Sequence, residues 1–170
     1  SLSGGQKQRA TIARGLCSGA PFLLLDDALS AVDAETEREI FGGILSSRGE
    51  RTVLFSTHRM ASLSRCDRIL VLAGGRIAEE GGHGDLLSRR GVYFDLYSRQ
   101  MLARELEEEM DISVRVGERV IHVEHSYASY DIDFCVYRCS HEGGAIQHIR
   151  VHDHRWVLAD ELDQYEFPAA

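Results

Sequence analysis

The sequence predicts an α/β fold for its first part, because short apolar runs alternate with segments of helical periodicity. The run 22–25 is continuous and apolar, the run 52–55 is apolar after Thr52, and polar residues follow both. Runs of this length are typical of strands that are buried on both faces of a parallel sheet. A helical pattern occupies 4–18 before the first run and 33–45 after it, which is the alternation expected of a parallel sheet with crossover helices.

The composition is that of an ordinary folded protein. The chain has 170 residues, of which 44% are hydrophobic and 27% charged, and this excludes a disordered chain. No apolar run is long enough for a transmembrane helix. The formal net charge of −8 argues against nucleic acid as a partner. Four cysteines without a signal peptide favour reduced thiols, and a start at Ser1 leads us to expect a fragment.

Charge is distributed unevenly along the chain. Residues 1–103 contain 13 Lys and Arg against 12 Asp and Glu, whereas residues 104–170 contain 6 against 15. A step of this size in composition predicts a boundary between two differently built regions. We therefore expect two domains, 1–103 and 104–170.

The start of the first helix has the features of an anion site. Ser3 and Gln6 have the spacing of a capping box, and Gly4 and Gly5 between them leave backbone N–H groups bare at the positive end of the helix dipole. These groups can hold a phosphate. For this short stretch alone, an ordinary helix start is the simpler interpretation. The apolar stripe that we expect this helix to bury is Ala10, Ile12, Ala13 and Leu16.

Two carboxylates follow the first predicted strand. Ligands and metals bind at the carboxyl ends of strands in open α/β sheets. Asp26 is placed to bind a divalent metal directly or through its water, and Asp27 to orient or deprotonate a water molecule. His58 follows the second strand at the same edge and is a candidate phosphate sensor. Solvated acids and a structural histidine remain the alternative.

The next elements complete the first region. Asp33 is positioned to cap a helix through about Leu45, and its expected apolar face is Ile40, Phe41, Ile44 and Leu45. A third strand is predicted at 69–72. The glycine pair after it predicts a hairpin with 76–80.

Together these segments resemble the ATPase domains of ABC transporters. The matching stretches are LSGGQKQR at 2–9 for the signature motif, FLLLDD at 22–27 for Walker B, SAVD at 30–33 for the D-loop and STHR at 56–59 for the switch-histidine loop. Their order and spacing fit the second half of such a domain over residues 1–103. The stretch 91–97 resembles the end of the ATPase domain in exporters.

This resemblance implies a subunit fragment that couples ATP hydrolysis, with Mg²⁺, to transport at the cytoplasmic face of the membrane. The implied partners are a second ATPase subunit, in an expected heterodimer, and the membrane-spanning domain of the exporter. The implied site residues are Ser3, Gly4, Gly5, Gln6 and Asp33 for the nucleotide, Asp26 for the metal, and Asp27 and His58 for catalysis.

Two departures from the family pattern change the expected activity. The sequence contains no Gly-x-x-x-x-Gly-Lys-Ser/Thr loop, so the chain is not expected to hold ATP by itself. Asp27 stands where the family has glutamate. Its carboxylate is one methylene shorter and lies back from the attacking water, which predicts a degenerate site of its own. The intact signature is still expected to complete the ATP site of the partner in trans.

The second region begins on an acidic helix predicted at 93–110. Glu105, Glu108 and Glu109 share one face of it and are a candidate Mg²⁺ or Mn²⁺ site. A solvated acidic helix end is the alternative. Strands are predicted at 112–117 and, half-buried, at 131–136, followed by a short helix at 159–165.

This region resembles part of a Nudix hydrolase. The stretch 104–112 is similar to the second half of the Nudix box, although Asp111 replaces its glycine. Segments similar to Nudix enzymes that cleave oxidised guanine nucleotides are 123–127, 156–157, 161–162 and 167–169. The resemblance implies a partial α+β domain and, as an alternative function, Mg²⁺-dependent nucleotide pyrophosphohydrolysis. A non-catalytic fusion or truncation product is a third possibility. Two half-domains would expose apolar strand faces and unpaired edges.

Histidine and cysteine are concentrated in the second region. Cys135 and Cys139 accompany six of the eight histidines there. No CxxC pair gives the spacing of a zinc site, so solvated strand histidines are favoured over zinc.

Overall fold

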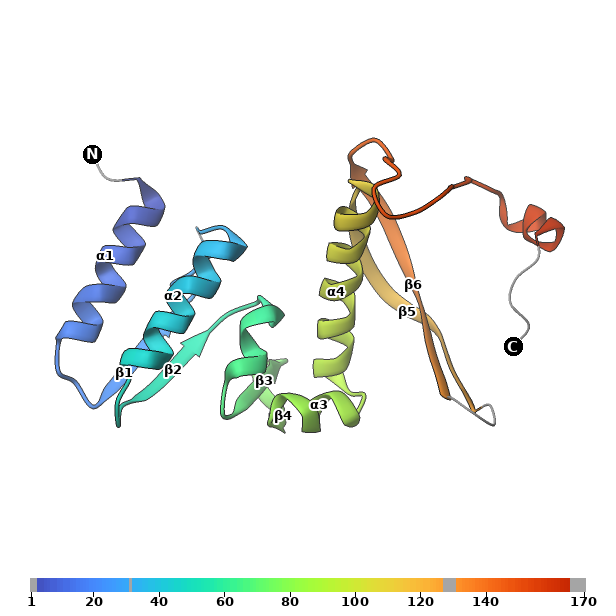
Figure 1. The fold of residues 1–170 in the computed structure, drawn as a ribbon. Helices are drawn as coiled ribbons and strands as arrows, with labels where there is room; N and C mark the ends of the chain where they lie inside the picture. Colours follow the sequence, from blue (N-terminus) through green and yellow to red (C-terminus); the bar gives the residue numbers. More distant parts are fainter. Residues whose placement is uncertain (1–2, 31, 127–130, 166–170) are drawn as a thin grey trace. The chain divides into compact units, whose positions relative to one another are not determined.

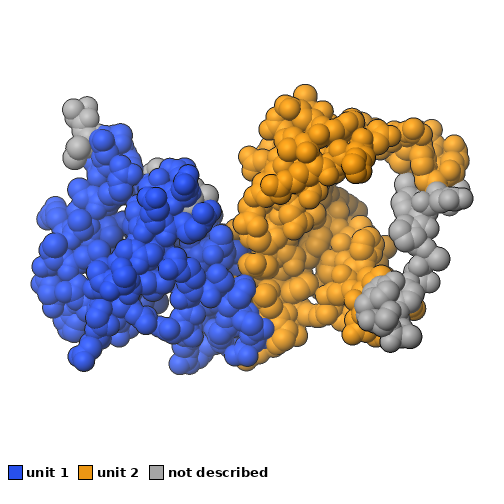
Figure 2. All heavy atoms as spheres, in the orientation of Figure 1, with its two compact units in different colours: residues 1–86 blue, residues 87–170 orange. Residues whose placement is uncertain are grey.

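The computed structural model describes residues 3–30, 32–126 and 131–165, and their arrangement confirms the α/β class. The chain divides into two compact units, Ser1–Leu86 and Leu87–Ala170 (Figure 2). This division falls before residue 103 because a single continuous helix runs through that position. The two domains inferred from composition, 1–103 and 104–170, stay a prediction.

The first unit is built on a parallel strand pair. Its leading elements are α1 (Gly4–Cys17), β1 (Phe22–Asp26), α2 (Ala34–Ser47) and β2 (Thr52–Ser56) (Figure 1). β1 and β2 pair in parallel, and Asp26 lies opposite Ser56. The parallel pairing was predicted, since two strands joined by a helix bring their carboxyl ends to the same edge.

Only one face of this strand pair is buried. Leu23 and Leu25 lie in the core with Ile44 of α2, whereas Phe22 is 51% exposed and Leu24 is 61% exposed. The prediction of burial on both faces is therefore wrong. The strands are buried on one face because α1 and α2 pack against that face, whereas no described element covers the other face.

The helix α1 buries a narrower stripe than predicted. Ile12 is buried and Leu16 partly buried, but Ala10 and Ala13 are exposed. The helix packs against β1 and α2, and Ala10 and Ala13 lie outside that contact. At Gly15 the helix approaches β1 so closely that a Cβ atom would lie 3.0 Å from Leu23 Cδ1.

The rest of the first unit contains the predicted hairpin. Its elements are the 3₁₀ helix η1 (Met60–Arg65), β3 (Ile69–Ala73), β4 (Arg76–Gly81) and α3 (His83–Ser88). β3 and β4 are antiparallel, and Gly74 and Gly75 form the turn with φ of 57° and 73°. Positive φ at both central residues is the requirement of a type I′ turn, which explains the glycine pair. The hairpin forms a sheet separate from β1–β2.

The second unit combines one helix with a long hairpin. Its elements are α4 (Val92–Met110), β5 (Ser113–Ser126), β6 (Asp131–Gly143) and the 3₁₀ helix η2 (Ala159–Gln164). The helix agrees with its prediction, and both strands extend beyond theirs. Ile132 and Phe134 are exposed, so the half-buried assignment of 131–136 is wrong at its start, because α4 packs against β5. No described helix is both long and apolar enough to cross a membrane.

Candidate functional site

The carboxyl ends of β1 and β2 bring polar side chains together. Ser56 Oγ donates a hydrogen bond to Asp26 Oδ1 at 2.5 Å and accepts one from the Asp27 backbone N–H at 3.0 Å. Both contacts follow from the parallel register that places Asp26 beside Ser56. The Ser56 hydroxyl therefore fixes the orientation of the Asp26 carboxylate and leaves its other oxygen available for a ligand.

Asp27 and His58 face each other at the same edge. Asp27 Oδ1 lies 3.6 Å from His58 Nδ1, and the two side chains are 54% and 73% exposed. The Asp27 carbonyl accepts hydrogen bonds from the backbone N–H and hydroxyl of Ser30. The sequence thus correctly placed Asp26, Asp27 and His58 at one sheet edge, whereas their chemical roles stay a prediction.

Asp33 is held by the helix that it caps. Its Oδ1 accepts from the backbone N–H of Glu35 and Thr36 at 3.1 and 2.9 Å, and its Oδ2 accepts from Thr36 Oγ1 at 2.7 Å. The hydrogen bonds from Thr36 lower the pKa of the Asp33 carboxyl below its ordinary value. The carboxylate therefore acts as the predicted cap of α2. Ala31 of the D-loop stretch lies outside the described residues.

A buried ion pair connects the two loops at this edge. Arg59 Nη1 donates to Glu37 Oε2 at 2.6 Å and to the Val32 carbonyl at 2.9 Å, while Nη2 donates to the Ser30 carbonyl at 3.2 Å. Ser62 Oγ donates to Glu37 Oε1 at 2.6 Å. Glu37 is only 4% exposed. This network joins the loop before α2 to the loop after β2, and so it positions the groups that both loops carry.

Sequence reasoning missed Glu37, although a signal was present. Glu37 precedes Phe41 by four residues and Ile44 by seven, which places it on the buried stripe of α2. A charged residue on such a stripe requires a partner of opposite charge. Arg59, next to the candidate His58, supplies it.

The start of α1 has the predicted capping box. Ser3 Oγ accepts from the Gln6 backbone N–H at 3.3 Å, and the Ser3 backbone N–H donates to Gln6 Oε1 at 2.9 Å. A Cβ atom at Gly4 would have nothing within 4 Å, so packing inside this chain does not require glycine there. The first turn carries no acidic residue. Leu2 of the signature stretch lies outside the described residues.

On the acidic face of α4, Glu108 is paired with two arginines. Glu108 Oε1 lies 3.4 Å from Arg104 Nε, and Glu108 Oε2 lies 3.8 Å from Arg150 Nη1. Among the described residues, two groups of three metal-ligating side chains have ligand atoms within 4.8 Å of one another. Neither group contains Glu105, Glu108 or Glu109. The structure therefore does not bring these three carboxylates together, and a Nudix-type metal site there has no geometric support.

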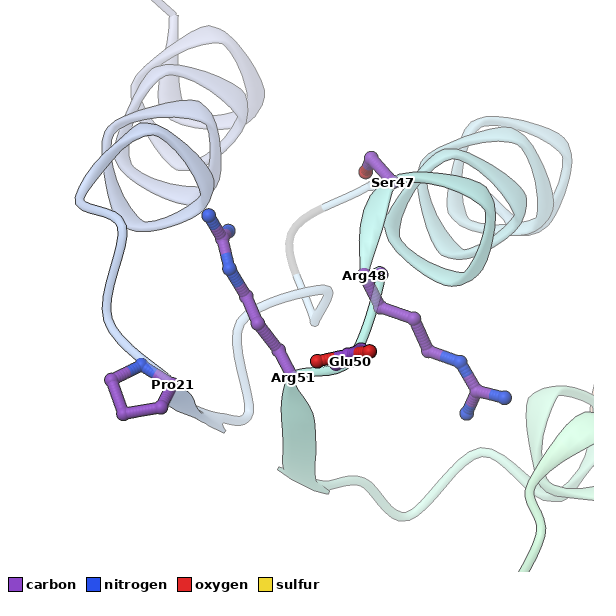
Figure 3. Close-up of a pocket in the computed structure, with 6 residues that line it drawn as sticks. Pro21, Ser47, Arg48, Glu50 and Arg51 are labelled. Atoms are coloured by element: carbon purple, nitrogen blue, oxygen red, sulfur yellow. The ribbon is translucent and has the colours of Figure 1, made fainter.

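An open surface pocket lies at the other end of the strands. It is formed around the loop between α2 and β2 and is lined by Pro21, Ser47, Arg48, Gly49, Glu50 and Arg51 (Figure 3). The Arg51 side chain reaches to α1 and donates to the Leu16 carbonyl. Arg48 pairs with Asp67 at 2.7 Å. These pairings occupy both arginines of the pocket, which lies at the opposite end of the strands from Asp26 and Ser56.

The carboxylates and the histidine thus lie at the carboxyl ends of parallel strands, where ligands bind in open α/β sheets. A solved structure described as a bacterial Atm1-family ABC exporter with ATP bound is 44% identical to this chain, with a TM-score of 0.55. The match covers 58% of this chain and 17% of that one. The matching part of the chain therefore has the fold of part of an ABC exporter.

Curated proteins agree with this likeness. The chain is 46% identical over 99 residues to an ATP-dependent lipid A-core flippase of Thiobacillus denitrificans, covering 58% of this chain and 17% of that protein. It is also 50% identical over 101 residues to YheI of Bacillus subtilis, a probable multidrug resistance ABC transporter ATP-binding/permease protein. This match covers 59% of this chain and 17% of YheI. No model of a known protein family matches the chain.

These similarities support the ABC exporter interpretation. None of these three relatives supports the Nudix-like interpretation of residues 104–170.

Proposed function

We propose that residues 1–103 are part of the ATPase domain of an ABC exporter and that this domain couples ATP hydrolysis to transport across the membrane. The observation that carries the proposal is the sheet edge where Asp26, Asp27 and His58 meet, with Asp27 Oδ1 3.6 Å from His58 Nδ1. The identity of 44–50% to ABC exporters over about 100 residues supports it independently.

At this edge each side chain has a distinct role. Asp26, oriented by Ser56, binds Mg²⁺ directly or through a water ligand. Asp27 takes the place of the family's general base, and His58 contacts the terminal phosphate of ATP. Because the Asp27 side chain is short, the carboxylate lies back from the attacking water, and hydrolysis at this site is slow.

The start of α1 acts on the ATP of a partner subunit. The first turn of the helix carries no acidic residue, and a Cβ atom at Gly4 would have nothing within 4 Å. Space for a phosphate therefore remains beside Gly4, at the positive end of the helix. Ser3 and Gln6 border this point, and Asp33 belongs to the loop that would face the partner. The partners are thus a second ATPase subunit, in a heterodimer, and the membrane-spanning domain of the exporter at the cytoplasmic face.

The test supplies the part of the domain that binds the phosphates. A chimera is made in which residues 1–103 follow the first part of the ATPase domain of a similar exporter, and it is assembled with a subunit that has an intact catalytic glutamate. Ser3→Arg or Gly5→Asp places a side chain where the terminal phosphate must lie. Each is expected to lower turnover at the partner's site at least about a hundredfold, since a displaced phosphate loses its positioning.

Arg14→Ala is the matched control. Arg14 is exposed in the last turn of the same helix, so its removal is expected to leave turnover within about twofold of the parent, as for other exposed side chains away from a site. Equal turnover in the Ser3, Gly5 and Arg14 variants would refute the proposed role of the helix start.

A further inference from the structure

The hairpin β5–β6 brings four metal-ligating side chains into one group. His122 lies directly opposite Cys135, and Glu124 directly opposite Asp133. Residues two apart on a strand point to the same face, and directly opposed residues of an antiparallel pair share that face. The register therefore places an imidazole, a thiol and two carboxylates on neighbouring positions of one face.

The ligand atoms of His122, Asp133 and Cys135 converge, and Glu124 lies beside them. His122 Nε2 lies 2.7 Å from Asp133 Oδ1, and Cys135 contributes a sulfur within 4.8 Å of the ligand atoms of both residues. Glu124 Oε1 lies 3.7 Å from His122 Nε2. These separations are those of atoms that can bind one ion, because zinc lies about 2.0–2.3 Å from nitrogen, oxygen and sulfur ligands.

Arg90 places a positive charge at the centre of the group. Its Nη1 lies 2.7 Å from His122 Nε2 and 2.8 Å from Asp133 Oδ1, and it also pairs with Glu124 Oε1. The single guanidinium charge faces two carboxylates, those of Glu124 and Asp133, and the imidazole of His122. One positive charge does not balance two negative charges, so the position favours a cation of higher charge.

We propose that His122, Asp133 and Cys135, with Glu124 as a fourth ligand, form a binding site for a divalent cation of the zinc class, and that Arg90 leaves the site when the cation binds. Mixed imidazole, carboxylate and thiolate ligands suit Zn²⁺ and Co²⁺ better than Mg²⁺ or Ca²⁺. On binding, the Cys135 thiol releases its proton to solvent, and the divalent charge replaces that of the guanidinium.

Cobalt is the probe because its thiolate complexes absorb light and zinc complexes do not. The 170-residue chain, kept reduced, is titrated with Co²⁺. One saturable site with cobalt–thiolate absorption is expected, and Zn²⁺ should abolish that absorption by displacing the cobalt. Cys135→Ser is expected to remove the absorption and to weaken binding at least about tenfold. Cys139→Ser, which changes a thiol four residues further along β6, is expected to change neither.

Arg90→Gln tests the displacement. Removing a positive charge from the centre of the site is expected to tighten Co²⁺ binding roughly tenfold. This variant removes no ligand, so it remains informative if Cys135→Ser perturbs the hairpin. Unchanged or weaker binding in Arg90→Gln would contradict the competition between the guanidinium and the ion.

A second group needs its own control. His148, Asp153 and His154 also have ligand atoms within 4.8 Å of one another, all three are exposed, and they contain no thiol. The variant His148→Ala with His154→Ala is expected to keep the thiolate absorption. The proposal would be overturned if this double variant lost the thiolate absorption or if Cys135→Ser kept it. It would also be overturned if the parent chain showed no saturable site.

Discussion

Asp27 adopts a left-handed backbone conformation with φ of 45° directly after β1. Asp and Asn enter this region more readily than most side chains. The backbone N–H of Asp27 is fixed by Ser56, and its carbonyl accepts hydrogen bonds from Ser30. The backbone at this residue is therefore well held, and the length of the side chain decides how far its carboxylate reaches toward a water molecule.

Asp27→Glu is expected to raise ATP turnover at least about tenfold in the chimeric dimer described above, because the longer side chain advances the general base. Glutamate at positive φ should lower stability by at most about 1 kcal/mol. Turnover is measured with the partner's own catalytic glutamate disabled. Asp27→Asn is the control, since it keeps the length and removes the base. Equal turnover in the parent and the glutamate variant would mean that Asp27 does not limit hydrolysis.

Glu37 is the residue on which the two loops of the sheet edge depend. Its carboxylate pairs with Arg59 and accepts from Ser62 while only 4% exposed. Glu37→Ala is expected to lower the free energy of unfolding by about 2–3 kcal/mol, because a half-buried guanidinium loses its partner. Glu39→Ala, at an exposed position of the same helix, should change it by less than about 0.5 kcal/mol. Urea denaturation followed by circular dichroism compares the two, and similar losses would contradict the role of the buried pair.

At the scale of elements, the first two helices of the first unit begin on side-chain caps. α1 starts on the Ser3 capping box, and α2 starts on Asp33. Each cap satisfies backbone N–H groups that have no partner inside the helix. Because the helix start is also where the candidate nucleotide groups lie, the caps fix the loops that precede them.

The cap of α2 predicts a dependence of stability on pH. The folded-state pKa of Asp33 is lowered by its hydrogen bonds from Thr36. Its ionised form therefore stabilises the fold above the ordinary Asp pKa of about 4, and this contribution is lost as the pH falls through the folded-state pKa.

Asp33→Asn keeps an acceptor and removes the charge. The variant is expected to be less stable than the parent at neutral pH, with a difference that shrinks as the pH falls below about 4. Urea unfolding at several pH values measures it. Glu35→Gln removes a charge from the same first turn without removing the cap, and serves as control. A difference that persists unchanged at acid pH would contradict the ionic part of this cap.

At the scale of the whole molecule, the open face of β1–β2 is the main departure from a self-sufficient fold. Phe22, Leu24 and Leu54 are 51%, 61% and 47% exposed on this face. Exposed contiguous apolar surface next to unpaired strand edges favours association. The match to the lipid A-core flippase and to the Atm1-family exporter covers 17% of the length of each.

The isolated chain is therefore expected to associate as its concentration rises. Phe22→Thr with Leu24→Thr should shift the midpoint of association to an at least about tenfold higher concentration, because the apolar area that drives it is reduced. Sedimentation velocity over a concentration series measures this shift. Ile149→Thr removes an exposed apolar side chain from the second unit and should leave the midpoint unchanged. Equal effects of the two changes would argue against a role for this face.

The sequence by itself determined the local elements and the edge of the sheet where the candidate residues meet. Caps, turn glycines and apolar periods act within a few residues, and for this reason α1, α2, the β3–β4 hairpin and α4 agree with their predictions. Parallel pairing of β1 and β2 followed from their connection, and it brought Asp26 and Asp27 beside Ser56 and His58.

Only the tertiary structure decided burial and long-range pairing. An apolar strand reads alike whether one face or two are covered, so the exposure of Phe22 and Leu24 could not be inferred from the run that contains them. The partners of Glu37 and the convergence of His122 with Cys135 depend on which residues of distant segments become neighbours. Such contacts are set by register and packing, which no pattern along a single segment contains.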